Sequence, residues 1–482
     1  MSKDRSFFCR LGLIVCLFLF IECVTSPIKN TPLKEENHIL SWNKREAETI
    51  KILTDLIRIK SVRGNEKQVA EYIRSIFEKE GIKTKLISEP GFPDRVNLIA
   101  ELEPNVPSSE KGLILGNHLD VVEADPKEWE EDPFAGTIKE GRIHGRGALD
   151  CKGLIVMQII SFLELKRSAV PLKRKVMFLS MADEESGSER GARFLLKVHP
   201  ELFKGYGYML NEGSFGTKDV AIPGSTIFNI QYAEKGNLWL NVKAKGDQGH
   251  GSTPSQNYPS LRLLKFLTEV LEYDTEIRIS EETQGFFYQL GSISSFPKSF
   301  ILKNSNIPVL RRLLYGPIRA SRQLSAITRN TKSVSGLKTE EGKGHNVLSS
   351  LAEAKLDVRL LPGFDPLEYL KEIRKIAEKY EVEVEPASTV TSDKSKLDSI
   401  LFQTIASVAT RKIPGSVAAP FISPGKTDNA YFRQIGMECY GLIPVLLSEK
   451  ELAMLHAKNE SISLENVQLG TQIIFEILYQ MN

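Results

Sequence analysis

Apolar residues in the N-terminal half of the chain alternate between helical and strand spacing. Between residues 50 and 82, apolar positions such as Ile50, Leu53 and Ile57 recur every three to four residues and predict two amphipathic helices. The segment 154–165 has the length and spacing of a buried helix. Short apolar runs bounded by turn residues predict buried strands at 97–100, 113–115, 176–179 and 208–210. This alternation predicts an α/β fold with a central mixed, largely parallel sheet covered by helices.

The pattern changes at Gly236, where an alternating strand (238–244) precedes a helical segment (259–273). A further strand, helix and strand are predicted at 354–360, 366–380 and 382–385. Residues 236–390 are therefore predicted to form an inserted α+β domain. The remaining chain is too short for a sheet of its own, so residues 391–482 are expected to complete the first domain, which begins at residues 48–235.

The N-terminal 25 residues have the layout of a signal peptide. Lys3, Arg5 and Arg10 precede the apolar run 11–21, and small residues follow it at Thr25 and Ser26. The run is shorter than the roughly 20 apolar residues that span a bilayer. We therefore predict cleavage and secretion, with an uncleaved membrane anchor as the alternative.

Composition narrows the classes of partner. Hydrophobic residues make up 41% and charged residues 26% of the 482 residues, which suits a globular protein with a large core. The formal charge of only +2 gives no reason to expect a nucleic-acid partner, so a small-molecule ligand is favoured. Beyond the predicted signal peptide the chain has only Cys151 and Cys439, which excludes a fold held together by a disulfide framework.

A basic and apolar stretch lies inside the predicted second domain. Residues 283–339 contain no acidic residue but include Arg311, Arg312 and Arg319 among other lysines and arginines. This pattern is typical of a solvated face, and it also suits peripheral contact with an anionic amphiphile or membrane surface.

Two glycine-rich motifs offer candidate metal ligands near predicted strand ends. In Gly116-Asn-His118-Leu-Asp120, residues two apart on an extended segment point the same way, so Asp120 could orient a metal-binding His118. A surface His–Asp pair would give the same triplet. The turn 145–153 delivers Asp150 immediately before the buried helix, where the residue could be a metal ligand or a helix N-cap.

Three further motifs add acids and a second histidine. Glu184 and Glu185 directly follow a predicted strand, Glu212 ends another, and His456 lies late in the chain. Acids gathered at the end of a buried strand are costly without cations, although a solvated loop would also accommodate them. Two imidazoles and three carboxylates are the ligand mix of a two-zinc hydrolase, and we predict the ligand set His118, Asp150, Glu185, Glu212 and His456.

Taken in order, the motifs resemble those of the glutamate carboxypeptidase, aminoacylase and carboxypeptidase S metallopeptidase family. The motifs are His118-Leu-Asp120, Gly145-Arg-Gly-Ala-Leu-Asp150, Asp183-Glu-Glu-Ser-Gly-Ser188, Asn211-Glu-Gly213, Gly249-His-Gly-Ser-Thr-Pro254, Lys426-Thr-Asp428 and His456-Ala-Lys-Asn-Glu460. The resemblance spans roughly residues 48–482. Within the family, the chain looks most like the secreted N-fatty-acyl-amino-acid synthase/hydrolases and carboxypeptidase S.

The resemblance implies a catalytic domain that binds two zinc ions and an inserted lid domain that often mediates dimerisation. It implies that Asp150 bridges both ions, that His118 and Glu212 complete one site, and that Glu185 and His456 complete the other. Glu184 would be the general base. The resemblance further implies that Asp120 supports His118 and that Asn346 and Arg359 bind the substrate carboxylate. It also implies that His250 stabilises the oxyanion, and in dimeric members this histidine comes from the partner subunit. For Arg359, an ion pair with Asp357 is the alternative.

One departure from the family pattern concerns Asn211, where many relatives of this branch have an aspartate. We predict that Glu212 is the ligand, because a carboxylate binds zinc better than an amide does. The predicted reaction is hydrolysis of an amide bond next to a free carboxylate. For the fatty-acyl branch, the resemblance also implies the reverse condensation. A carboxypeptidase or dipeptidase with the same site and a catalytically silent secreted binding protein are the alternatives.

Overall fold

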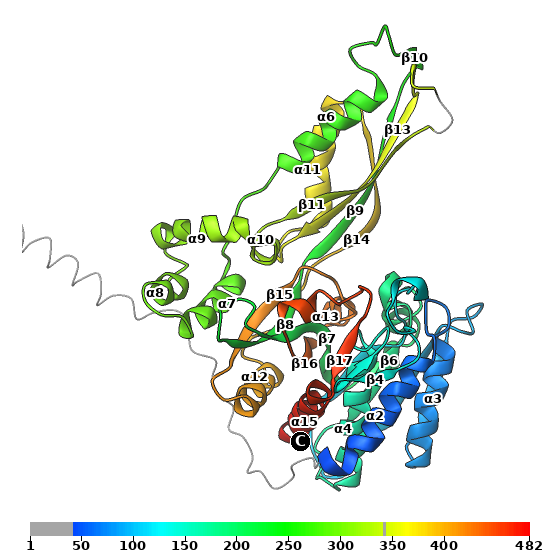
Figure 1. Ribbon diagram of the computed structural model, residues 1–482, viewed down its shortest axis with the longest axis vertical. Helices are drawn as coiled ribbons and strands as arrows, with labels where there is room; N and C mark the ends of the chain where they lie inside the picture. Colours follow the sequence, from blue (N-terminus) through cyan, green and yellow to red (C-terminus); the bar gives the residue numbers. More distant parts are fainter. Residues whose placement is uncertain (1–41, 341–343) are drawn as a thin grey trace, which may run out of the picture.

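The computed structural model describes residues 42–340 and 344–482, and its largest element is an eight-stranded mixed sheet (Figure 1). The strands, in spatial order, are β1 (Thr84–Ser88), β2 (Val96–Leu102), β6 (Val176–Met181), β3 (Gly112–His118), β7 (Tyr206–Lys218), β16 (Glu438–Leu447), β8 (Thr226–Glu234) and β15 (Val417–Ser423). Strand β3 pairs in parallel with both β6 and β7, whereas β1 and β2 join antiparallel. The predicted mixed α/β sheet is confirmed.

Side chains alternate between the two faces of this sheet. Leu113 and Phe178 contribute to the core on one face, and Ile114 and Leu179 to the core on the other. The helices on the first face are α2 (Trp42–Arg58), α3 (Glu66–Lys79), α4 (Lys152–Arg167), α12 (Ile400–Lys412) and α15 (Leu464–Met481). The second face is covered by α5 (Ala192–Val198) and α13 (Asn429–Gln434). Burial on both faces explains why these strands read as continuous apolar runs.

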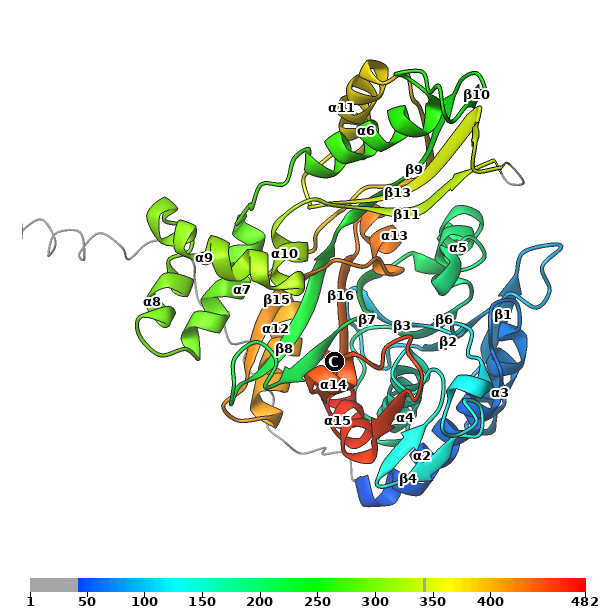
Figure 2. The same cartoon turned by 45° about the horizontal axis from the view of Figure 1, so that its top comes forward.

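A separate four-stranded antiparallel sheet carries its own core. Its strands, in spatial order, are β11 (Thr331–Thr339), β13 (Leu351–Leu360), β9 (Gly236–Lys245) and β14 (Glu383–Val390). Helices α6 (Pro259–Glu272) and α11 (Pro366–Lys379) cover one face, with Leu240 and Phe266 in the shared core. Trp239, next to Leu240, points to the opposite face and is 44% exposed. Figure 2 shows α5 and α13 on the side of the eight-stranded sheet that faces this second sheet.

Four short helices lie in the basic stretch, between α6 and β11 in the sequence. They are α7 (Glu281–Ser292), α8 (Lys298–Lys303), α9 (Pro308–Ala320) and α10 (Arg322–Thr328). They share a core with Ile227 of β8 and Ala419 of β15, so this part of the inserted segment packs on the edge of the eight-stranded sheet.

The N-terminal prediction lies outside the described residues, since residues 1–25 are not among them. No helix in the described ranges combines the length and apolar character needed to cross a membrane. Cys151 and Cys439 are buried free thiols, so no disulfide supports the described fold.

Candidate metal centre and substrate cleft

Parallel strands place several predicted site residues at one edge of the eight-stranded sheet. His118 is the last residue of β3. Glu184 and Glu185 follow β6 after Asp183, whose left-handed φ of 67° turns the chain. Glu212 lies within β7, just beyond the residues that pair with β3. Because parallel strands end at the same edge, these side chains converge.

Asp150 reaches the same place from a turn between β5 (Arg142–His144) and α4. The buried carboxylate of Glu460 holds this turn: it accepts the backbone N–H groups of Gly147 at 3.0 Å, Leu149 at 2.7 Å and Asp150 at 3.1 Å. It also pairs with the guanidinium of Arg146 at 2.7 Å. A residue near the C-terminus therefore fixes the backbone around Asp150.

His456 lies between α14 (Glu449–Leu452) and β17 (Ser461–Ser463). Strand β17 pairs antiparallel with β5, which itself pairs with β4 (Thr137–Lys139) in a three-stranded sheet. This pairing brings the His456 segment beside the turn that carries Asp150. His456 has a left-handed φ of 57°.

The side chains meet in two groups around Asp150. One oxygen of Asp150 lies 3.0 Å from His118 Nε2, and the other lies 3.2 Å from His456 Nε2. His456 Nε2 is also 3.2 Å from Glu185 Oε1. The potential ligand atoms of Asp150, Glu185 and His456 lie within 4.8 Å of one another, as do those of His118, Glu184 and Glu212. The structure thus brings the five predicted ligands together, with Glu184 beside them.

The electrostatics of this cluster suit cations. Burial raises the pKa of Glu212 well above its usual range, and the negative charge of Asp150 raises it further. Burial raises the pKa of Glu184 in the same way, with the charge of Glu212 adding to the effect. Hydrogen bonds with Asp150 and Glu185 raise the pKa of His456 to about 10. A bound divalent cation would relieve the repulsion among these carboxylates, and the imidazole and carboxylate donors are ligands that zinc accepts.

Asp120 connects the end of β3 with the turn after β6, through its backbone and its side chain. Nδ1 of His118 lies 2.9 Å from the backbone carbonyl oxygen of Asp120, so Nδ1 donates a proton and Nε2 is left free for a cation. The carboxylate of Asp120 accepts the backbone N–H groups of Glu184 and Glu185, each at 3.1 Å. Asp120 therefore fixes the positions of His118 and of both glutamates.

Asn211 and Glu212 point in opposite directions from β7, as neighbouring strand residues do. Glu212 offers an oxygen to the group that contains His118, whereas the Asn211 side chain packs on Gly116 of β3. Glu212, and not Asn211, therefore faces the cluster of candidate metal ligands.

His250 and Asn346 lie far from the cluster in the same chain. His250 belongs to the hairpin of β10 (Gly249–His250) and β12 (Val347–Leu348), and Asn346 immediately precedes β12. Figure 1 shows β10 at the end of the four-stranded sheet remote from the eight-stranded sheet. Both side chains are exposed, and neither belongs to the groups of candidate metal ligands.

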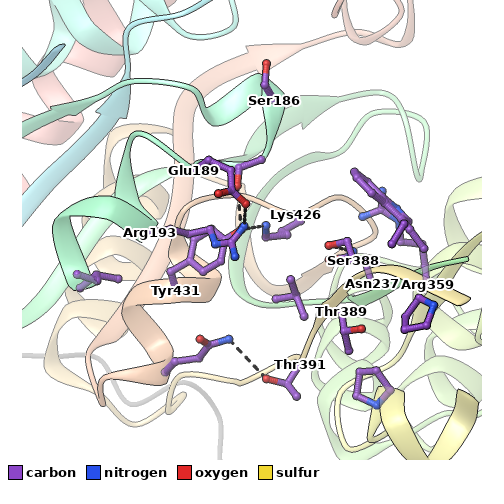
Figure 3. Close-up of a pocket in the computed structure, with 18 of the residues that line it drawn as sticks. Ser186, Glu189, Arg193, Asn237, Arg359, Ser388, Thr389, Thr391, Lys426 and Tyr431 are labelled. Atoms are coloured by element: carbon purple, nitrogen blue, oxygen red, sulfur yellow. Dashed lines mark hydrogen bonds and ion pairs between the residues drawn. The ribbon is translucent and has the colours of Figure 1, made fainter. Parts of the chain in front are cut away.

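A cleft of about 1210 Å³ opens beside Glu184 and Glu185, between the two sheets (Figure 3). One wall comes from α5, α13 and the loop before α13, and the other from β9, β13, β14 and the start of α11. Arg359 lines this cleft, and it makes the ion pair with Asp357 that the sequence offered as the alternative, at 2.8 and 3.2 Å.

Sequence reasoning gave no role to two residues that the structure places at the site. Glu460 is only the last residue of a motif, and the polar Ser461 that follows it gives no sign of its burial. Lys426 was included only beside Thr427 and Asp428, yet its side chain reaches into the cleft (Figure 3). Nothing in the local pattern separates such a lysine from a solvated one.

Comparison with known proteins identifies the family of the chain. Residues 114–480 match peptidase family M20/M25/M40. The chain is 26% identical over 496 residues to the N-fatty-acyl-amino acid synthase/hydrolase PM20D1 of Xenopus tropicalis, covering 97% of this chain and 93% of that protein.

Solved structures with the same fold include two peptidases. The M20 family metallo-carboxypeptidase Sso-CP2 of Sulfolobus solfataricus has a TM-score of 0.69 and 22% identity, covering 90% of this chain and 99% of that one. Human carnosine dipeptidase 1 has a TM-score of 0.67 and 17% identity, covering 91% of this chain and 97% of that one.

Proposed function

The chain belongs to peptidase family M20/M25/M40, and from this premise we propose that it is a secreted two-zinc hydrolase of N-acyl amino acids. Its substrates would carry an amide bond next to a free carboxylate, and the same site could also form that bond. The observation that carries the proposal is that Asp150 faces His118 with one oxygen and His456 with the other, while Glu184 lies beside His118 and Glu212 and lines the cleft.

Each zinc ion would have three protein ligands. His118, Asp150 and Glu212 would hold one ion, and Asp150, Glu185 and His456 the other. Two zinc ions would polarise the scissile carbonyl group and lower the pKa of water. Asp150 suits the bridging role because its two oxygens face different histidines.

Glu184 would be the general base of the reaction. It lies in the ligand group of His118 and Glu212 and also lines the cleft, so it can reach both water and substrate. Glu184 would take a proton from the attacking water and return it to the departing amine. Asp120 would keep Glu184 in place through the hydrogen bond to its backbone N–H.

His250 would stabilise the oxyanion from a second copy of the chain. It is exposed and distant from its own metal cluster, which supports a homodimer formed through the four-stranded-sheet domain. Mixing the inactive variants Glu184→Gln and His250→Ala tests this proposal, because a mixed dimer regains one complete site. A monomer at assay concentration, shown by analytical ultracentrifugation, would contradict it.

The acyl group distinguishes this proposal from a carboxypeptidase or dipeptidase with the same centre. The similarity to the relative named N-fatty-acyl-amino acid synthase/hydrolase supports the acyl-amino-acid assignment. A dipeptidase is the second candidate, because carnosine dipeptidase 1 has the same fold. Apolar side chains of the cleft, such as Leu196, Leu367 and Ile435, suit an acyl chain.

Metal analysis and a substrate screen test the function together. We expect about two zinc ions per chain and fastest hydrolysis of N-oleoyl-phenylalanine among N-oleoyl-phenylalanine, N-acetyl amino acids and dipeptides. The variant Glu184→Gln should retain zinc and lose roughly 10²–10⁴-fold in kcat. Dipeptide preference would support the second candidate. Turnover that is unchanged in Glu184→Gln would contradict the mechanism, and absence of metal and turnover would indicate a binding protein.

Peripheral lipid contact would follow from the basic helices α8 and α9. Phe296, Val309 and Leu313 are exposed large apolar residues of this region, and Arg312 and Arg319 are exposed on the same helix α9. Replacing Arg311, Arg312 and Arg319 by glutamine should weaken sedimentation with phosphatidylserine vesicles and leave binding to neutral vesicles unchanged. Equal binding by both proteins would contradict lipid contact. N-terminal sequencing of the secreted protein tests cleavage near residue 25.

A further inference from the structure

The cleft contains arginines whose charges are already compensated. Arg193 on α5 forms an ion pair with Glu189, and Arg359 on β13 forms one with Asp357 at 2.8 Å. The carboxylate of Asp357 is fixed further, since the indole N–H of Trp239 donates to it at 3.0 Å. An anionic ligand would have to compete with these carboxylates for either arginine.

Lys426 differs from these arginines in having no acidic partner. Its side chain is half-buried in the wall of the cleft, and no ion pair among the described residues includes it. Lys197, another lysine that lines the cleft, is exposed to solvent. A half-buried cation is favourable only when its donors and its charge are satisfied. Among the described residues, Lys426 thus provides a positive charge within the cleft that no carboxylate contacts directly.

Tyr431 holds the ammonium group of Lys426 in position. The ammonium donates to the Tyr431 hydroxyl and lies 4.0 Å from the centre of its ring. The Tyr431 hydroxyl in turn donates to the carbonyl oxygen of Gly187 at 3.2 Å. An ammonium group has three N–H donors, so two remain for a ligand. Figure 3 shows Lys426 and Tyr431 on the wall opposite Asn237 and Arg359.

Lys426 also shares the cleft with Glu184, the residue proposed to return a proton to the departing amine. Glu184 lines the same cleft, and its charge acts on Lys426: burial lowers the pKa of Lys426, while the carboxylates of Asp428 and Glu184 oppose that shift. In an N-acyl amino acid the scissile nitrogen and the carboxylate are attached to the same carbon atom. A cation that holds this carboxylate must therefore lie close to the group that protonates the nitrogen.

We propose that Lys426, positioned by Tyr431, binds the free carboxylate of the substrate and so determines the preference for acyl amino acids over neutral amides. This inference rests on the proposed function and specifies which residue selects the substrate. The substrate carboxylate would then bind Lys426 instead of Arg359, whose guanidinium already forms an ion pair with Asp357. Lys426 lies on the same wall of the cleft as the proposed metal ligands.

Binding to a catalytically blocked enzyme tests the assignment without turnover. In the zinc-loaded Glu184→Gln protein, calorimetry compares N-oleoyl-phenylalanine, N-acetyl-phenylalanine and glycyl-phenylalanine with their primary amides. Adding Lys426→Met should weaken binding of the carboxylates about ten- to hundredfold and leave the amides unchanged. Lys426→Arg should restore part of the affinity. Lys204→Met, which removes the same charge from an exposed position outside the cleft, should change nothing.

Kinetics of the otherwise unaltered enzyme give an independent readout. Lys426→Met should raise KM for the carboxylate substrate about ten- to hundredfold with kcat nearly unchanged. Three results would overturn the assignment: binding of none of the carboxylates, a carboxylate preference that survives Lys426→Met, or a preference lost in Arg359→Met instead. Failure of the proposed function would be seen separately, as absence of hydrolysis by the unaltered enzyme while Lys426-dependent binding persists.

Discussion

The carboxylate of Glu460 accepts the backbone N–H of Asp150 at 3.1 Å, although the two residues are 310 positions apart. Glu460 follows His456 by four residues and is fully buried. One carboxylate therefore sets the distance between the two residues proposed to share a metal ion.

Replacing Glu460 by glutamine should disturb this arrangement. Oε1 accepts from Leu149 and Asp150, and Oε2 accepts from Arg146 and Gly147. A carboxamide would place its own donor against N–H groups and leave the buried Arg146 guanidinium without a counter-charge, so we expect a loss of about 3–5 kcal/mol in stability. Zinc affinity should fall about 10–100-fold.

Urea unfolding and competition with a zinc chelator measure the two effects of Glu460→Gln. The matched control is Glu465→Gln, at an exposed position on α15. Unchanged zinc affinity in a folded Glu460→Gln protein would show that the Asp150 turn does not depend on this carboxylate.

Replacing Asp120 by asparagine should reduce turnover. Each oxygen of Asp120 accepts one backbone N–H, from Glu184 or from Glu185, and an amide can supply only one of the two acceptors. We expect kcat to fall about 10–100-fold while zinc content is largely retained. Steady-state kinetics with metal analysis test this, and exposed Asp94→Asn is the control. Full activity in Asp120→Asn would rule out a positioning role.

The sequence was informative where function depends on local order and uninformative where it depends on distant contacts. His118 could be predicted because it follows an apolar strand in a glycine-flanked motif. Glu460 could not, since its partners in the 145–150 turn meet it only through the pairing of the three-residue strands β5 and β17. Lys426 could not either, because its lack of an acidic partner is a property of the folded cleft.

The edge strand β15 of the eight-stranded sheet is also hard to predict from the local sequence. Strand β15 contains Pro420 and alanines in place of a continuous β-branched run, so its local pattern is weak. Its place is fixed by parallel pairing with β8, about 190 residues earlier in the chain, and by the core that it shares with α7. Similarly, the motif identified His250, but only the fold shows its distance from Asp150 within one chain.

Replacing a ligand that both zinc ions share should release more zinc than replacing a ligand that binds only one ion. Asp150 faces both histidines, whereas His456 belongs to one ligand group only. Asp150→Asn should therefore lose most of both zinc ions, and His456→Ala should retain about one per chain. Mass spectrometry for zinc after dialysis measures this.

Thermal stability gives a second readout of the same sites. Zinc at 100 times its dissociation constant should stabilise the unaltered protein by about 2.7 kcal/mol per site relative to the chelated form. Loss of both ions in His456→Ala, or of only one in Asp150→Asn, would contradict the proposal that Asp150 bridges two ions.

A buried ion pair at the start of the inserted segment should be important for stability. Glu234, the last residue of β8, lies 3.2 Å from Arg433, and both side chains are almost fully buried. Glu234 also accepts from the backbone N–H of Thr427 at 3.1 Å and from its hydroxyl at 2.6 Å. Glu234→Gln should cost about 3–5 kcal/mol, because Arg433 would remain buried without a counter-charge.

A double replacement identifies the cause of that loss. In Glu234→Leu/Arg433→Met no charge is left buried, so the double variant should be more stable than either single variant, although the Thr427 hydrogen bonds are lost. The exposed pair of Glu368 and Lys371, at 2.6 Å, is the control, and Glu368→Gln should change stability by less than about 1 kcal/mol. Urea unfolding compares the unaltered protein with Glu234→Gln, Glu234→Leu, Arg433→Met, the double variant and Glu368→Gln. If Glu234→Gln matches Glu368→Gln, or if the double variant loses the sum of both single changes, the unpaired charge is not what stabilises this junction.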